Sequence, residues 1–272
     1  MLRQNDKNMT KQFEKLTDPQ WNAISNIFSK RKRILSLRAV LNALLYIVRT
    51  GTQWRNLPEG NPKWTAVYYY FRKWIADGTF EKINFRLNQI DREREAKNLT
   101  PSLLCVDSQS VKLSPMLQKD RGIDGNKHVN GRKRQYLVDT GGRLCAVVVH
   151  AANVADGKGG LTLLDRIESI TERLEKFLGD TAYNGVFAEA VEKKGFKYER
   201  SARIGGNADQ IMEQPKTGKK FIVEAKRWVV ERSFGWTNFF RRNTKDYERN
   251  VESSEVWLLL ANSTIMLQRI LT

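Results

Sequence analysis

Three acidic residues beyond residue 100 stand beside or within apolar segments. Asp107 ends the run 103–106, Asp180 ends the run 177–179, and Glu231 lies in the largely apolar stretch 227–236. A carboxylate in such a setting is costly to bury alone, so each must face a partner, a metal ion or water. Mg²⁺ prefers carboxylate and water ligands, and two such ions about 3.5–4 Å apart stabilise the attacking and leaving oxygens of a phosphodiester. The three acids are therefore candidate catalytic residues and metal ligands.

Each of these acids also has a simpler explanation when it is considered alone. Asp107 and Asp180 could cap strand ends or form surface salt bridges. Glu231 has a ready partner in Arg227, one helical turn earlier. What favours a shared site is their common setting, because strand ends are where α/β sheets open their clefts. Asp139 lies inside a predicted hairpin, and we interpret it as structural.

The chain is strongly basic. Its 47 Lys and Arg residues against 30 Asp and Glu give a net charge of +17 and a pI near 9.9. This surplus favours a nucleic acid, because neutralising phosphates releases counterions. A protein charged only for solubility would scatter these residues, but here they cluster in three groups, which are Lys127, Arg132, Lys133 and Arg134; Lys216, Lys219, Lys220, Lys226 and Arg227; and Arg241, Arg242 and Lys245.

The remaining composition excludes several classes of protein. With 40% hydrophobic residues and six prolines, the chain is globular rather than disordered. It has no apolar stretch long enough to span a membrane, and its first residues lack the apolar run of a secretory signal. Cys105 and Cys145 lie in apolar runs, which predicts buried thiols, and no zinc-site spacing is present. We expect a cytoplasmic, nucleoid-associated protein.

The first hundred residues are predicted to be helical. Residues 1–15 are polar and expected to be flexible, and residues 16–98 form a small all-α domain. Thr17, Asp18 and Pro19 mark a helix start, and apolar spacing predicts helices near 36–49, 64–76 and 80–96. Short helices with exposed basic residues are typical of a helix-turn-helix-like DNA-binding module. We interpret the aromatic residues of 64–76 as core.

The pattern changes after residue 100. Strands are predicted at 102–107, 136–140, 143–150, 176–180 and 196–200, with Gly141 and Gly142 joining a hairpin. Helices are predicted near 158–172, 185–194, 224–240 and 254–271. This order predicts an α/β domain over 99–272, with a mixed sheet flanked by helices.

Several unusual blocks, in order, resemble the DDE transposases of bacterial insertion sequences, in the insertion-sequence-five family. Among them are the motifs Gly179-Asp180-Thr181-Ala182-Tyr183 and Arg227-Trp228-Val229-Val230-Glu231-Arg232. The other matching blocks are 16–21, 41–51, 53–58, 106–112, 131–134, 138–140 and 241–248. The resemblance runs from about residue 16 to the C-terminus.

The resemblance implies a ribonuclease H-like catalytic domain in which Asp107, Asp180 and Glu231 form the acidic triad. Asp107 would bridge two Mg²⁺ ions, for which Mn²⁺ can substitute, and the other two acids would hold one ion each. In the family signature around the Glu, Glu224 replaces a Tyr and Asn238 replaces a Lys, so Arg241 or Arg242 is expected to supply the contact of that Lys. The expected DNA-contacting residues are Lys112, Arg132, Lys133, Arg134, Arg227, Arg232, Arg241 and Arg242.

The implied function is metal-dependent cleavage and strand transfer at the ends of an insertion sequence. The implied partners are double-stranded DNA, at the transposon ends and the target, and a second copy of the chain, because two DNA ends must be held together. Two alternatives stay open: a ribonuclease H-like nuclease that cuts without joining, and a domesticated DNA-binding regulator.

Overall fold

A six-stranded mixed sheet forms the centre of the molecule. The computed structural model describes residues 13–29, 31, 34–200 and 228–270. The strands are β1 (Leu103–Lys112), β2 (Gly122–Ile123), β3 (Asn130–Asp139), β4 (Leu144–Ala151), β5 (Lys176–Gly179) and β6 (Lys197–Arg200). β3 pairs antiparallel with β1, β2 and β4, whereas β5 is parallel to β1 and β6 is parallel to β5. The order β4-β3-β1-β5-β6 is the ribonuclease H-like arrangement, which confirms the predicted fold class.

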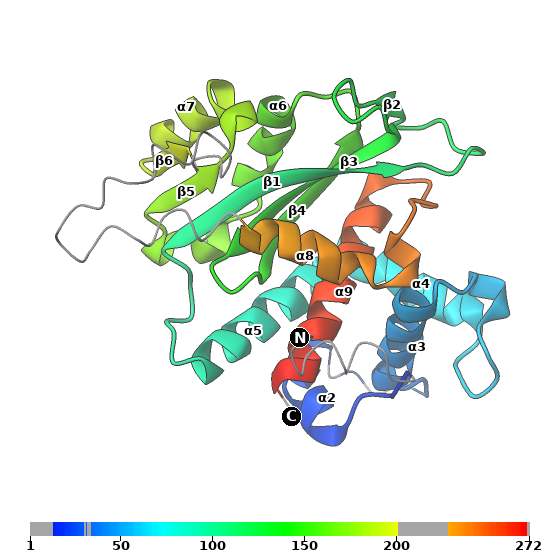
Figure 1. The fold of residues 1–272 in the computed structure, drawn as a ribbon. Helices are drawn as coiled ribbons and strands as arrows, with labels where there is room; N and C mark the ends of the chain where they lie inside the picture. Colours follow the sequence, from blue (N-terminus) through cyan, green and yellow to red (C-terminus); the bar gives the residue numbers. More distant parts are fainter. Residues whose placement is uncertain (1–12, 30, 32–33, 201–227, 271–272) are drawn as a thin grey trace, which may run out of the picture.

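Helices cover both faces of this sheet. The N-terminal ones are α2 (Asp18–Asn22), α3 (Leu37–Thr50), α4 (Trp64–Ala76) and α5 (Thr79–Arg94). Between and after the later strands come α6 (Asp156–Leu161), α7 (Val186–Lys193), α8 (Trp228–Asn238) and α9 (Val251–Ile270). Figure 1 shows α6 and α7 on one side of the sheet and α5, α8 and α9 on the other.

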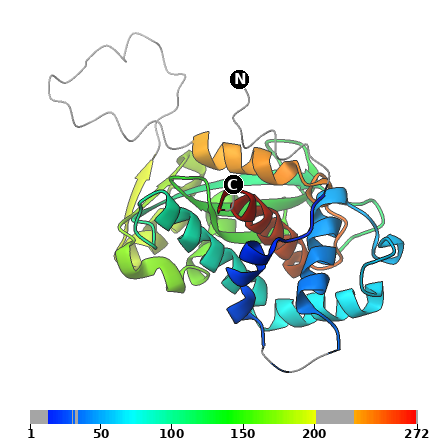
Figure 2. The same ribbon diagram turned by 90° about the horizontal axis from the view of Figure 1, so that it is seen from below.

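Two hydrophobic cores lie on the two faces. One contains Leu104, Val106 and Phe177 of the sheet together with Phe187 of α7. The larger core lies on the opposite face of the sheet and contains residues of α3, α4, α5, α8 and α9. In this core α9 runs between α5 and α3 (Figure 2). The N-terminal helices therefore have no separate core, although the boundary near residue 98 stays a prediction.

Local signals explain the ends of α3. Ser36 caps its start, because its side chain accepts a hydrogen bond from the backbone of Ala39. Gly51 ends it with a φ of 72°, the left-handed conformation that suits glycine. A Cβ atom at Gly51 would stand 3.1 Å from the Cβ of Arg241, so the end of α3 is closely packed on the turn that follows α8.

A buried ionic cluster ties α5 to the β3–β4 hairpin. Arg143 donates to Asp91 at 2.7 Å and to Asp139 at 3.1 Å, and Arg92 also pairs with Asp139. All four side chains are almost fully buried. Asp139 thus has the structural role expected from its place in the hairpin.

Several predicted elements differ from the structure, and the largest differences concern one helix and one strand. The helix expected over 158–172 ends at Leu161 and continues as two 3₁₀ segments, Thr162–Asp165 and Glu168–Arg173. Its start is closely packed, since a Cβ at Gly160 would lie 3.0 Å from the ring of Phe187. The strand expected from residue 136 begins at Asn130, because the charged run before it is paired with β1 and β4. Within the described residues, no helix has the length and apolar character needed to cross a membrane.

Candidate active site

Asp107 and Asp180 meet at the centre of the sheet. β1 and β5 are parallel, with Cys105 opposite Leu178, so two further residues along each strand bring Asp107 beside Asp180. Neighbouring strands lie about 4.8 Å apart. Because side chains alternate between faces, both acids share the face of Cys105 and Leu178, which belong to the core beneath α8. Both are half-buried.

Hydrogen bonds fix the backbone around each aspartate. Asp180 is the N-cap of the short 3₁₀ helix Thr181–Tyr183, and its side chain accepts a hydrogen bond of 2.9 Å from the backbone of Ala182. The hydroxyl of Tyr198 donates to the carbonyl of Asp180 at 2.8 Å. At Asp107 the carboxylate accepts a hydrogen bond of 2.7 Å from the backbone of Ser108.

Tyr183 is three residues after Asp180, and both aspartates influence its phenol electrostatically. Its ring is buried, and its hydroxyl donates to the side-chain oxygen of Gln135. Burial raises the pKa of Tyr183 well above its usual value, and the negative charges of Asp107, Asp156 and Asp180 raise it further. The phenol therefore stays protonated at neutral pH.

Glu231 approaches this face from α8. The two residues before it, Val229 and Val230, are buried against the sheet, and Phe234 packs on Tyr136 with ring centroids 4.6 Å apart. Tyr136 is the register partner of Asp107, so α8 lies over the strand that carries the first aspartate. The side chain of Glu231 is itself exposed.

The donor chemistry of the three acids fits a hard divalent cation, because all the ligands would be carboxylate oxygens. In the part of the chain that the structure describes, no three His, Cys, Asp or Glu side chains are gathered closely enough to hold an ion. The structure thus brings Asp107 and Asp180 together and carries Glu231 on a helix above them, without a closed ligand set.

The basic run of β3 is inside the protein. Arg132, Lys133 and Arg134 are only 0%, 5% and 2% exposed. Arg132 pairs with Asp246 and donates to the carbonyl of Glu248 at 2.8 Å. Buried side chains on a central strand cannot reach a phosphate, which corrects the sequence-based assignment of these three residues to DNA contacts.

Lys133 belongs to a polar cluster that supports the site from the opposite face. Its ammonium lies 3.0 Å from Asp156, which also accepts a hydrogen bond of 2.7 Å from the hydroxyl of Ser108. Gln135 joins this cluster to Tyr183. The sequence analysis did not single out Asp156 or Gln135; Ser108 was detectable because it follows Asp107 directly.

The other residues predicted to contact DNA differ in their exposure. Lys112 and Arg241 are exposed, whereas Arg242 pairs with Glu248 at 2.5 Å. Arg232 lies between two rings of its own helix, 4.3 Å from the centroids of both Trp228 and Trp236.

Arg232 also donates to the carbonyl of Gly141 at 3.0 Å, so it anchors α8 to the hairpin. Arg227 and Glu224 lie outside the described residues. So does the cluster from Lys216 to Lys226.

A ribonuclease H-like sheet with acids on adjacent strands and a third acid on a covering helix is the framework of a class of enzymes that cut and join nucleic acid strands. The chain belongs to the family described as "Transposase DDE domain", whose model matches residues 98–266, more than half of the chain. A second family model, described as "Putative transposase of IS4/5 family", matches residues 16–84.

Comparison with individual proteins adds three likenesses. An uncharacterized protein of Sinorhizobium fredii is 33% identical over 73 residues, which is 25% of this chain and 58% of that protein. The chain thus spans less than two thirds of this relative. The chain is similar to piggyBac transposase as solved in a synaptic complex with hairpin DNA. The TM-score is 0.39 and the sequence identity is 11%, and the match covers 91% of this chain and 70% of that one. The paired-end complex of Mos1 transposase with a left transposon end has a TM-score of 0.26 and 14% identity, over 63% and 61%.

Proposed function

We propose that this protein is the transposase of an insertion sequence, which cleaves DNA at the ends of the element and joins those ends to a target. The observation that carries the proposal is the pairing of Asp107 with Asp180 on adjacent parallel strands beside the buried phenol of Tyr183. Family membership adds the reaction class, since the transposase domain model covers both aspartates and Glu231.

We assign the metal ligands as follows. Asp107 would contact both of two Mg²⁺ ions, and Asp180 and Glu231 would hold one each, with Mn²⁺ as a substitute. When bound, the ions would neutralise charge on the scissile phosphate and activate first water and then a 3′-hydroxyl for attack. Because Glu231 is exposed, its carboxylate is free to turn toward the aspartates when DNA and metal ions are bound.

The test is a cleavage and joining assay with DNA that carries the inverted repeats flanking the gene. The unmodified protein is expected to give joined products in Mg²⁺. Asp107→Asn should lower the rate by about three orders of magnitude or more, because a triad member acts as part of a unit. Asp165→Asn, which changes an exposed aspartate of the same domain, is the matched control and should leave the rate unchanged.

The other outcomes identify the alternatives. Cut but unjoined DNA would indicate a nuclease, and DNA binding that is indifferent to Asp107→Asn, with no cleavage by any variant, would indicate a regulator. We also propose that the active species on DNA is at least a dimer, because two ends must be held together. A monomeric complex with two DNA ends, measured by light scattering, would contradict this assembly.

A further inference from the structure

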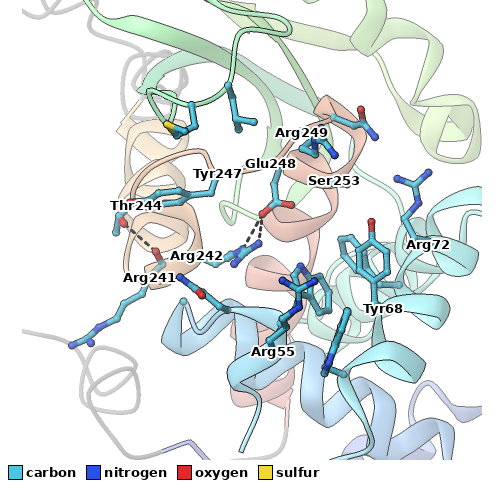
Figure 3. A pocket seen from close by; sticks show the side chains of 18 of the residues that line it. Arg55, Tyr68, Arg72, Arg241, Arg242, Thr244, Tyr247, Glu248, Arg249 and Ser253 are labelled. Carbon is cyan, nitrogen blue, oxygen red and sulfur yellow. Dashed lines mark hydrogen bonds and ion pairs between the residues drawn. The ribbon is translucent and has the colours of Figure 1, made fainter.

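A broad groove lies between the N-terminal helices and the segment that follows α8. One wall is formed by the end of α3, the turn Trp54–Asn56 and α4, and the other by residues 116–119 and 241–253. Its volume is about 1400 Å³. Figure 3 shows Arg55, Tyr68 and Arg72 on one wall, with Glu248 and Arg249 across from them.

The groove is positively charged. Arg55, Arg72, Lys119 and Arg249 line it with exposed side chains, and none of the four forms an ion pair with any described residue. Glu248 is the one acidic residue among the described lining residues, and Arg242 neutralises it at 2.5 Å. Uncompensated cations on facing walls favour an anionic occupant.

Aromatic rings stand among these cations. Tyr68 and Tyr247 line the groove and are 40% and 53% exposed, so part of each ring is open to contact. One face of the Tyr247 ring carries Lys245, whose ammonium lies 5.6 Å from the ring centroid. Tyr68 is held from behind by Trp54, whose ring centroid is 5.2 Å away. The prediction that the aromatic residues of α4 are core holds for Phe71 and Trp74, which are buried, but is wrong for Tyr68 and Tyr69, which are exposed.

Cations interleaved with available aromatic faces suit a single strand of nucleic acid. Phosphates need the cations, and an unpaired base gains free energy by stacking on a tyrosine. In a duplex the base faces are already stacked on one another, so a recessed ring cannot reach them unless a base is turned out.

We propose that this groove binds unpaired nucleotides of DNA, with phosphates on Arg55, Arg72, Lys119 and Arg249 and bases on Tyr68 and Tyr247. The identity of the nucleic acid as DNA rests on the proposed function. The position of the groove fits this role, because Arg241 and Arg242 on its wall follow α8, the helix of Glu231, by only a few residues.

The first test removes the aromatic faces. A fluorescein-labelled oligodeoxynucleotide, single-stranded or annealed to its complement, is titrated with the full chain in EDTA, and anisotropy is measured. The double variant Tyr68→Leu/Tyr247→Leu should weaken single-strand binding about fivefold or more and leave duplex binding unchanged. Tyr69→Leu is the matched control, because Tyr69 lies on the same helix, is 60% exposed and does not line the groove.

The second test removes the cations. The triple variant Arg72→Gln/Lys119→Gln/Arg249→Gln should reduce the salt dependence of single-strand binding, lowering the slope of log K against log salt by about 2. Lys73→Gln, an exposed neighbour outside the groove, should change the slope far less. Thermal melting of every variant checks that the fold is retained.

Three results would overturn the inference: unchanged single-strand affinity in the tyrosine variant, an equal loss for the duplex, or equal losses in the Tyr69 and Lys73 controls. Because EDTA excludes catalysis, these results are independent of the proposed function. If the protein binds single strands through the groove and never cleaves DNA, the transposase assignment is wrong and the proposed role of the groove still holds.

Discussion

The charged residues of β3 and those of the groove differ in how their closeness in the sequence relates to their exposure. Arg132, Lys133 and Arg134 are consecutive in sequence and buried, with partners such as Asp246 and Asp156. The groove cations come from segments far apart in the chain, yet they gather on one exposed surface. Clustering of cations along the chain therefore does not by itself mean that they lie on the surface.

The difference has a physical cause. A central strand buries residues of both faces, so a charged strand is stable only when acids from elsewhere neutralise it. Arg134 shows what happens when this is incomplete: two of its guanidinium nitrogens have no hydrogen-bond partner in the described part of the chain, and burial lowers its pKa. Inner charges should thus govern stability, and outer ones should govern DNA binding.

The largest effect is expected at Arg132. Arg132→Met should lower the free energy of unfolding by about 3–5 kcal/mol, because it leaves the buried carboxylate of Asp246 without its cation. Lys112→Met, at an exposed position on the neighbouring strand, is the control, and its effect should stay within about 0.5 kcal/mol. Urea denaturation of both variants measures the two free energies of unfolding. A loss of less than about 1 kcal/mol in Arg132→Met would contradict the expected difference.

Glu255 is a second test of the comparison, because its buried carboxyl group has few partners among the described residues. Burial raises its pKa to about 7, and its described partners are the backbone of Val149, at 2.9 Å, and Arg166, at 3.4 Å. The carboxyl holds its proton more tightly when folded than when unfolded. Its charge therefore begins to destabilise the fold as the pH rises above the unfolded value near 4.5, and the full effect is reached above about 7.

Glu255→Gln should remove this pH dependence. In weakly alkaline buffer the variant should be more stable than the unmodified protein, by up to about 3 kcal/mol at about 1.4 kcal/mol per pKa unit, and the two should converge in acid. The control Glu192→Gln changes an exposed acid on α7, on the other side of the sheet, and should keep the original profile. If the Glu255→Gln variant is instead the less stable of the two in alkaline buffer, the charge of Glu255 is needed by the fold.

The smallest effect on stability is expected in the groove. Arg249→Gln should change the free energy of unfolding by less than about 0.5 kcal/mol, since the side chain is exposed and forms no ion pair with any described residue. Denaturant midpoints of the variant and the unmodified protein should coincide. A destabilisation comparable to that of Arg132→Met would mean that the groove cations also hold the fold together.

Much of the fold could be predicted from sequence because apolar spacing is local. The predicted helix 64–76 coincides with α4, and the hairpin at Gly141 and Gly142 joins β3 to β4. The helix predicted at 158–172 was too long, because α6 ends at Leu161 and two 3₁₀ segments follow it. The start of β3 was missed because a charged run is not typical of a buried strand.

The candidate site could be predicted only in part. Asp107 and Asp180 each end an apolar run, and that local signal marked both before their adjacency was known. Nothing local links Arg132 to Asp246, or Tyr183 to Gln135, because these pairs are brought together by the fold alone. Residues whose role depends on a distant partner were therefore misassigned or missed.

The shared core has a consequence for how such an enzyme can change over time. Leu41 and Phe71 from the N-terminal helices lie in the same core as Trp257 of α9. A chain shortened to begin at residue 99 would leave that wall of α9 bare, and it would aggregate rather than persist as a bare nuclease. Helices that share their core with the sheet cannot be exchanged as a separate unit, so these helices must change by point substitution.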